Sequence, residues 1–329
     1  MAGVQGHALA VAVSQAGGLG SLPCAMLTPA AMQAELTALT AQTDRPYNVN
    51  FFCHMPPQPD PARQAAWFGA LAPCYAALGL APPTGAAGPG RVPFSAEALQ
   101  VLQAFRPPVV SFHFGLPDPA LLAPIKAWGA KVLASATTVA EALWLADHGA
   151  DAVIAQGLEA GGHRGHFLGD DLSEQMGTFA LVPQVVAALG GRAPVIAAGG
   201  IADAAGVAAA KALGAAGVQI GTAYLLCPEA TTGTLHRAAL VSEGARHTAL
   251  TNLFTGRPAR GIVNRLMREL GPMSPLPPAF PLATAAIAPL RAAGEKRGSG
   301  DISPLWSGQN ASGCREVGAA TLTRELAGV

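Results

Sequence analysis

The stretch AQGLEAGGHRGHF (155–167) contains the residues best suited to chemistry. Gln156 stands at the end of an apolar run, two glycines follow, and then come His163 and Arg164. A loop histidine flanked by glycines is placed for proton transfer rather than packing, and imidazole can remove an acidic proton bound to carbon. The alternative is an exposed histidine in a flexible loop, and this stretch alone leaves both interpretations open.

Two further strand ends carry polar side chains. His113 follows the apolar run 109–112, where its ring would face the interior or the mouth of a barrel, although a core histidine is the alternative. Asn48 and Asn50 share one face of a strand, and buried amides need hydrogen-bond partners. The ring edge of a ligand would supply them, as would a turn or a polar network. The other histidines are expected to be structural: His7, His54, His148, His166, His236 and His247.

Two glycine-rich segments predict a phosphate site. AAGGIAD (197–203) is followed about twenty residues later by QIGT (219–222). Glycines at the ends of neighbouring late strands let backbone N–H groups approach a phosphate, and the next helix N-terminus adds a favourable potential. The same glycines could instead serve only tight turns. The residues expected to hold the phosphate are Gly199, Gly200, Gly221 and Thr222.

The pattern of apolar runs predicts the elements that position these residues. Short, continuously apolar runs alternate with helix-length segments, which is typical of parallel strands covered on both faces. Strands are expected over 17–22, 47–52, 109–114, 131–136, 152–157, 194–200 and 217–225. Helices are expected over 7–16, 29–42, 118–128, 138–148, 178–189 and 203–213. With seven strands, the first strand of an eight-stranded barrel is missing at the N-terminus, or the barrel closes differently.

Two regions depart from this alternation. Residues 55–104 are Pro-rich and contain PPTGAAGPGR (82–91), so we expect an excursion across the barrel mouth, with a flexible linker as the alternative. After Pro228, an Ala-rich region predicts helices around 232–243, 261–269 and 282–293. The expected organisation is a TIM-type barrel over 1–230 and a helical substrate subdomain over 231–329, whose last segment returns to the barrel.

Composition and charge exclude several classes of function. Half of the 329 residues are hydrophobic and 12% are charged, which predicts a globular protein rather than a disordered one. The 20 Lys and Arg residues balance the 20 Asp and Glu residues, so no global field attracts nucleic acid or an anionic membrane. Five scattered cysteines predict neither a disulfide framework nor a metal site. Without a visible export signal or membrane span, a cytoplasmic protein is expected.

Six segments together resemble a known family, namely GGLGSL, NVNFF, SFHFGLP, AQGLEAGGHRG, AAGGI and QIGTAYL. Their order and spacing over residues 1 to about 227 are similar to those of the class I nitronate monooxygenases, formerly grouped as 2-nitropropane dioxygenases. WSGQNAS (306–312) is similar to that family's closing segment. The resemblance implies a (β/α)8 TIM-type barrel with a helical C-terminal subdomain and non-covalent FMN. It also implies oxidation of alkyl nitronates, such as propionate 3-nitronate, by O2 to a carbonyl compound and nitrite or nitrate.

The resemblance also implies roles for individual residues. His163 matches the family's catalytic histidine, and His113 falls in a motif near the substrate. The implied flavin contacts, including the phosphate glycines, are Asn50, Gln156, Gly161, Gly199, Gly200, Gln219, Ile220, Gly221 and Thr222. The family usually begins with a strand ending in a PMAG-like loop, of which only MAG (1–3) is present here.

Two alternative enzyme functions stay open, with a non-enzymatic FMN-binding role as a more remote third. A flavin reductase of the same superfamily, an NAD(P)H-dependent quinone or enoyl-thioester reductase, shares the glycine-rich flavin site and needs no second dinucleotide motif. A flavin-free barrel lyase or isomerase would also use the phosphate site. The expected partners are a small-molecule nitronate and O2, without nucleic acid or membrane. The sequence does not indicate an oligomeric state.

Overall fold

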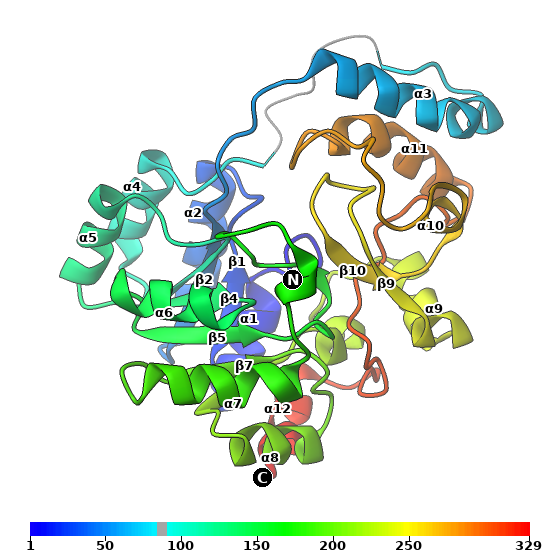
Figure 1. The fold of residues 1–329 in the computed structure, drawn as a ribbon. Helices are drawn as coiled ribbons and strands as arrows, with labels where there is room; N and C mark the ends of the chain where they lie inside the picture. The colour runs from blue at the N-terminus through cyan, green and yellow to red at the C-terminus, as the bar shows by residue number, and fades with distance from the viewer. Residues whose placement is uncertain (84–90) are drawn as a thin grey trace.

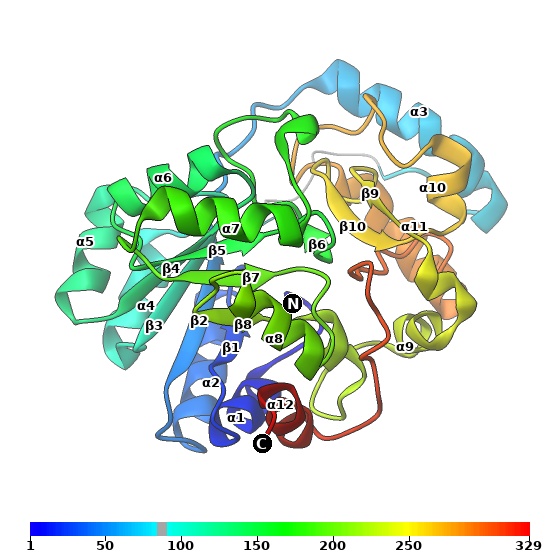
Figure 2. The same cartoon turned by 60° about the horizontal axis from the view of Figure 1, so that its bottom comes forward.

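A curled parallel sheet of seven strands forms the centre of the fold (Figures 1 and 2). The computed structural model describes residues 1–83 and 91–329, so residues 84–90 of the expected PPTGAAGPGR excursion lie outside the described residues. Neighbouring strands follow chain order and pair in parallel. The strands are β1 (Gly20–Pro23), β2 (Tyr47–Phe52), β3 (Val109–His113), β4 (Lys131–Ala136), β5 (Ala152–Gln156), β7 (Val195–Ala198) and β8 (Gly217–Gln219).

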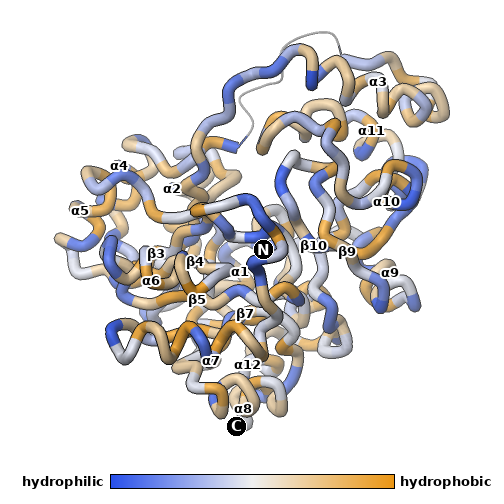
Figure 3. Tube along the Cα trace, in the orientation of Figure 1, coloured by the Kyte–Doolittle hydropathy of each residue, from blue (hydrophilic) through white to orange (hydrophobic). Residues whose placement is uncertain are grey.

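Helices cover the outer face of this sheet, as the second view shows most clearly (Figure 2). They are α1 (His7–Gln15), α2 (Pro29–Thr40), α4 (Ala96–Phe105), α5 (Pro119–Ala127), α6 (Val139–Asp147), α7 (Thr178–Leu189), α8 (Ala204–Ala212) and α12 (Ala319–Ala327). Hydrophobic residues follow the central strands and α7 (Figure 3). Val49, Val110 and Val153 are fully buried between sheet and helices. The predicted α/β TIM-type fold is therefore confirmed, as a half-barrel of seven strands.

The N-terminal segment 1–6 lies between the two outer strands of the half-barrel. Among the described residues, β8 does not pair with β1. Instead, Gln5 forms a bridge with Ala230, which follows β8, and its Nε2 donates a hydrogen bond to the Ser21 carbonyl in β1. Met1 packs against the same apolar cluster as Val218 and Ile220. This segment therefore contacts β1 on one side and the chain that follows β8 on the other.

A second unit stands beside the barrel (Figure 1). Its antiparallel sheet has the order β6 (Gly162–His163), β10 (Ala259–Ile262) and β9 (Thr248–Thr251). Around this sheet lie α9 (Thr234–Val241), α10 (Arg265–Leu270), α11 (Thr284–Lys296) and, from far earlier in the chain, α3 (Pro61–Leu78). Within the described residues, no helix is long and apolar enough to cross a membrane.

Helix α3 was not predicted, because prolines hide it in the sequence. Asp60 caps its N-terminus through a hydrogen bond to the Arg63 N–H of 2.9 Å, and Pro73 lies inside it. The helix packs against α11 through two hydrogen bonds. The Trp67 indole N–H donates to the Ala283 carbonyl at 3.4 Å, and the Tyr75 hydroxyl donates to the Ala286 carbonyl at 2.6 Å. The Pro-rich excursion thus leads α3 onto α11 before the chain returns to the barrel through α4.

Two predicted elements were partly wrong. The strand predicted over 217–225 ends at Gln219, because Thr222–Leu226 forms a 3-10 helix whose apolar side chains pack into two clusters with α12 and with α9. The helix predicted over 261–269 begins only at Arg265, after the N-cap Asn264. Its expected first residues form β10, since Gly261 leaves room for the backbone of Leu305.

The packing of α3 against α11 predicts the effect of truncating Leu71. Leu71 is fully buried in the cluster that includes Ile287 and Leu290 of α11. Leu71→Ala should lower the free energy of unfolding by about 2–5 kcal/mol, because it removes buried methyl groups and leaves a cavity. Urea denaturation measures this change. The control Val241→Ala alters a side chain that is 71% exposed and should cost less than about 0.5 kcal/mol. Equal effects would contradict this packing.

Candidate active site

The segment 157–167 carries His163 from the barrel into the small sheet. It leaves the end of β5 and forms β6, which pairs antiparallel with β10 so that His163 lies opposite Ala259. The Arg164 N–H then donates to the Pro258 carbonyl at 2.8 Å. His163 is half-buried. Backbone pairing therefore holds this histidine, and the interpretation as an exposed residue in a flexible loop was wrong.

The fully buried guanidinium of Arg164 anchors the same segment. Its Nε donates to Gln175 Oε1 at 2.7 Å, its Nη1 to the Gly157 carbonyl at 2.6 Å and its Nη2 to the Gln156 carbonyl at 2.7 Å. Burial lowers the Arg164 pKa to about 10, so the group stays charged at neutral pH. Because a buried cation needs hydrogen-bond acceptors, Arg164 fixes the end of β5 relative to His163.

His163 lies among aromatic rings contributed by several elements. Its ring centroid is 5.3 Å from that of Phe280, 5.5 Å from Trp306 and 6.1 Å from Phe114. Its Nε2 lies 2.9 Å from Thr255 Oγ1. Burial, followed by nearby positive charges, holds the His163 pKa well below its usual range. The imidazole is therefore neutral at physiological pH, with one ring nitrogen as donor and the other as acceptor.

His113 and Gln156 both support the His163 backbone. The carbonyl of His163 accepts hydrogen bonds from His113 Nε2 at 3.1 Å and from Gln156 Nε2 at 2.9 Å. Because His113 Nε2 must carry the proton to donate there, its Nδ1 accepts from Ser135 Oγ at 3.0 Å. Burial lowers the His113 pKa to about 3, in keeping with this neutral form. The structure thus brings all three predicted residues together, with His113 in a positioning contact.

A polar network lies on the face of the sheet that carries the predicted asparagines. Asn48 Nδ2 donates to Ser21 Oγ at 2.7 Å and to Ser111 Oγ at 2.8 Å, and Ser111 Oγ donates to Asn50 Oδ1 at 2.8 Å. Neighbouring serines therefore supply several of the partners, as the polar-network alternative predicted. Asn50 is half-buried and keeps its amide N–H groups for other acceptors, whereas the buried Asn48 Oδ1 has no partner among the described residues.

The predicted phosphate glycines gather beneath the C-terminal segment. Gly199 and Gly200 have φ angles of +119° and +73°, which favour glycine. Asn310 Nδ2 donates to the Gly200 carbonyl at 2.9 Å, and the Gly308 N–H donates to Thr222 Oγ1 at 3.0 Å. The segment WSGQNAS therefore returns to the barrel across the ends of β7 and β8.

Gly161 has a clear steric reason to be glycine. A Cβ atom there would lie 2.5 Å from the Gly308 backbone nitrogen and 2.6 Å from the carbonyl carbon of Ser307. No side chain fits this approach, since real Cβ contacts are longer. Gly161 thus lets the C-terminal segment close over the predicted phosphate site.

The phosphate end offers donors that the protein itself does not use. Among the backbone hydrogen bonds described outside helices and strands, none is donated by Gly200, Gly221 or Thr222. Gln219 is exposed at the end of β8, while Ile220 packs into a neighbouring apolar cluster. Free backbone N–H groups at glycine-rich strand ends suit a phosphate. No group of three or more metal-ligating side chains occurs among the described residues.

Several residues around His163 were missed by the sequence analysis. They come from distant segments without a local motif: Arg91, Thr255, Arg257 and Phe280. His54 was expected to be only structural, but its ring centroid lies 4.8 Å from that of Phe280. Trp306 was marked only by WSGQNAS. Their convergence depends on how the second unit packs on the barrel, which spacing in the sequence cannot reveal.

Comparisons with known proteins agree with this geometry. The profile of a family described as nitronate monooxygenase matches residues 1–327. A nitronate monooxygenase of Pseudomonas aeruginosa is 43% identical over 329 residues, which cover 99% of this chain and 93% of the relative. A structure of nitroalkane oxidase from Streptomyces ansochromogenes has a TM-score of 0.90 at 40% identity, covering 100% and 93%. FabK from Thermotoga maritima has a TM-score of 0.70 at 26% identity, covering 100% and 89%.

The buried histidines predict a loss of stability in acid. Burial is the first cause that lowers the pKa of His54 to about 4, of His166 to about 3 and of His113 to about 3, from an ordinary value of 6.5. At pH values between the lowered pKa of each folded histidine and its ordinary pKa, the unfolded chain binds more protons than the folded chain. The contribution of these histidines to the free energy of unfolding should therefore fall as pH decreases through 6.5, by at most about 1.4 kcal/mol per pH unit for each histidine.

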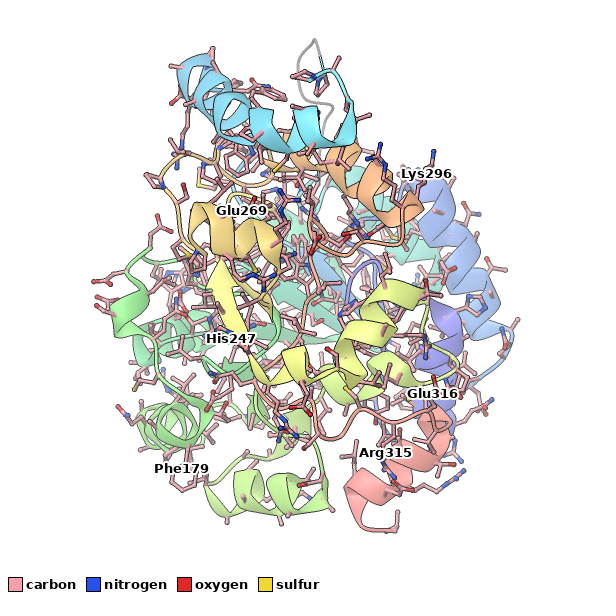
Figure 4. All side chains as sticks on the ribbon, turned by 90° about the vertical axis from the view of Figure 1, so that its right-hand side faces the viewer. Phe179, His247, Glu269, Lys296, Arg315 and Glu316 are labelled. Carbon is pink, nitrogen blue, oxygen red and sulfur yellow. The ribbon has the colours of Figure 1, made fainter. Side chains whose placement is uncertain are left out.

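Urea denaturation between about pH 8 and about pH 5 measures this dependence. His166→Asn should make the slope shallower. The control His247→Asn, at a solvent-exposed position labelled in Figure 4, should leave the slope unchanged. A free energy of unfolding that does not change with pH over this range would contradict the burial of these imidazoles.

Proposed function

The chain belongs to the nitronate monooxygenase family, and we propose that it uses bound FMN to oxidise alkyl nitronates with O2 to a carbonyl compound and nitrite or nitrate. Propionate 3-nitronate is the substrate we expect. The observation that carries the proposal is the neutral, half-buried His163, held among aromatic rings beside the strand ends of the half-barrel. The coarser conclusion, that the protein is an oxidoreductase enzyme, follows from its family.

The residues at the strand ends fit FMN in their donor chemistry. When bound, FMN supplies the two-electron acceptor that no amino-acid side chain provides. The backbone N–H groups of Gly200, Gly221 and Thr222 would hold its phosphate, with Gly199 allowing the close approach. The amide of Asn50 would meet the polar edge of its ring. The remaining predicted flavin contacts are Gln156, Gly161, Gln219 and Ile220.

His163 would act on the nitro group or on the carbon beside it. A nitronate is already an anion, and an imidazole N–H would stabilise the charge on its oxygens. A neutral nitroalkane must first lose a proton from that carbon, which the neutral imidazole would accept. The contact with Thr255 orients the imidazole ring of His163. Hydrogen bonds from His113 and Gln156 hold its backbone carbonyl, so the residue is fixed for either task. A direct contact between His113 and substrate remains part of this proposal.

The reductase alternative deserves a direct comparison, because FabK matches this chain over its full length with a TM-score of 0.70. The higher TM-score of 0.90 and identity of 40% for the nitroalkane oxidase favour nitro-compound chemistry. Oxygen uptake by the FMN-loaded protein should be rapid with propionate 3-nitronate and accompanied by nitrite or nitrate. Rapid NADH consumption without nitronate turnover would reject the proposal in favour of a reductase.

The role of His163 predicts different effects on neutral and anionic substrates. His163→Asn should reduce kcat/KM for a neutral nitroalkane by at least about 100-fold, because the base is lost, while turnover of the corresponding nitronate falls less. FMN content, measured from absorbance after gel filtration, should not change. The control His247→Asn should behave as the unaltered protein. If His163→Asn retains full activity with the nitroalkane, this histidine is not the base.

A further inference from the structure

Two arginines pack on the aromatic wall around His163, which we define as the rings of Phe114 and Phe280. The Cζ atom of Arg257 is 4.3 Å from the ring centroid of Phe114, and that of Arg91 is 5.6 Å from the ring centroid of Phe280. The two rings lie 5.5 Å apart, and both contact the imidazole of His163. Two cations from distant parts of the chain therefore reach the same aromatic cluster as the proposed catalytic residue.

Neither guanidinium has a carboxylate within 4.0 Å among the described residues. Two carboxylates lie near Arg257 without contacting it. Buried Glu141 accepts hydrogen bonds from Thr137 and from the backbone of 167–168, and the exposed carboxylate of Asp170 lies 3.4 Å from the neutral imidazole of His166. Among the described residues, both guanidiniums thus lie beside the site without a contacting carboxylate, and Asp170 and Glu141 act on Arg257 only from a longer distance.

The arginines also have few hydrogen bonds within the protein. Arg257 Nη2 donates to the His166 carbonyl, but its buried Nε has no acceptor among the described groups. Arg91 Nη1 has a long contact of 3.4 Å with Thr284 Oγ1. Leaving a partly buried cation without a contacting anion is costly in free energy, so these two arginines point to an anionic ligand. Burial is the first cause that lowers the pKa of His163, and the charges of both arginines lower it further, in keeping with a positive potential around this ring.

We propose that Arg257 and Arg91 form an anion subsite that binds a carboxylate at the far end of the substrate, so that the enzyme selects nitronates with a second negative charge. A guanidinium suits this task because its planar fork matches the two oxygens of a carboxylate and its face stacks on an aromatic ring. The phosphate glycines contact a different segment, 308–310, so this subsite is separate from the proposed phosphate site. The inference rests on the proposed function.

The test compares two nitronates of equal chain length on the FMN-loaded protein. The kcat/KM for propionate 3-nitronate should exceed that for propyl-1-nitronate, which lacks the carboxylate, by about tenfold or more. Arg257→Met and Arg91→Met should each reduce this ratio toward one, mainly by raising KM for the dianion. Arg257→Lys should restore part of the preference. The control Arg246→Met, at a side chain that is 81% exposed, should keep the ratio.

A binding measurement separates this inference from the proposed function. 3-Nitropropionate should raise the melting temperature of the unaltered protein more than 1-nitropropane does, and Arg257→Met should abolish the difference. If neither nitronate is oxidised, the proposed function fails, and the melting temperatures still decide the subsite. Equal preference for both nitronates, or equal loss of both activities in Arg257→Met without a change in their ratio, would overturn the subsite.

Discussion

The position of His163 depends on the burial of one charged group, the guanidinium of Arg164. A guanidinium cannot shed its charge at neutral pH, so the protein must surround it with acceptors. The carbonyls of Gln156 and Gly157 and the side chain of Gln175 meet this demand. The chain after β5 is thereby drawn back onto the end of its own strand, and the preceding residue, His163, is delivered to the edge of the small sheet.

A buried anion completes this arrangement from the other side. Glu141 at the start of α6 accepts hydrogen bonds from Thr137 and from the Phe167 N–H, so both ends of the segment 164–167 are fixed to the barrel. Pairing of β6 with β10 then joins this segment to the second unit. The site therefore needs both units, because the barrel supplies the strand ends and the second unit supplies Thr255, Phe280 and Trp306. Neutral histidines beside unpaired arginines leave the site positive, which suits an anionic substrate.

Sequence reasoning succeeded where one local pattern carried the information. Strands β2 and β4 were predicted with their observed ends, since short β-like runs that alternate with helix-length segments are typical of βαβ units. A single glycine-rich stretch contains both Gln156 and His163, which the structure brings into contact. Sequence reasoning failed for α3, because the internal Pro73 argues against a helix that is in fact stabilised by burying Trp67 against α11. The two-residue strand β6 and the arginines of the aromatic wall have no local signature, because tertiary packing alone brings them to the site.

Anaerobic reduction of the bound flavin by a nitronate tests the central claim most directly. The FMN-loaded protein is mixed with propionate 3-nitronate without oxygen, and its visible absorbance is recorded, with NADH in a parallel sample. Rapid loss of flavin absorbance with the nitronate, and little change with NADH, is the result that this account predicts. A flavin spectrum that the nitronate leaves unchanged and NADH bleaches would contradict it.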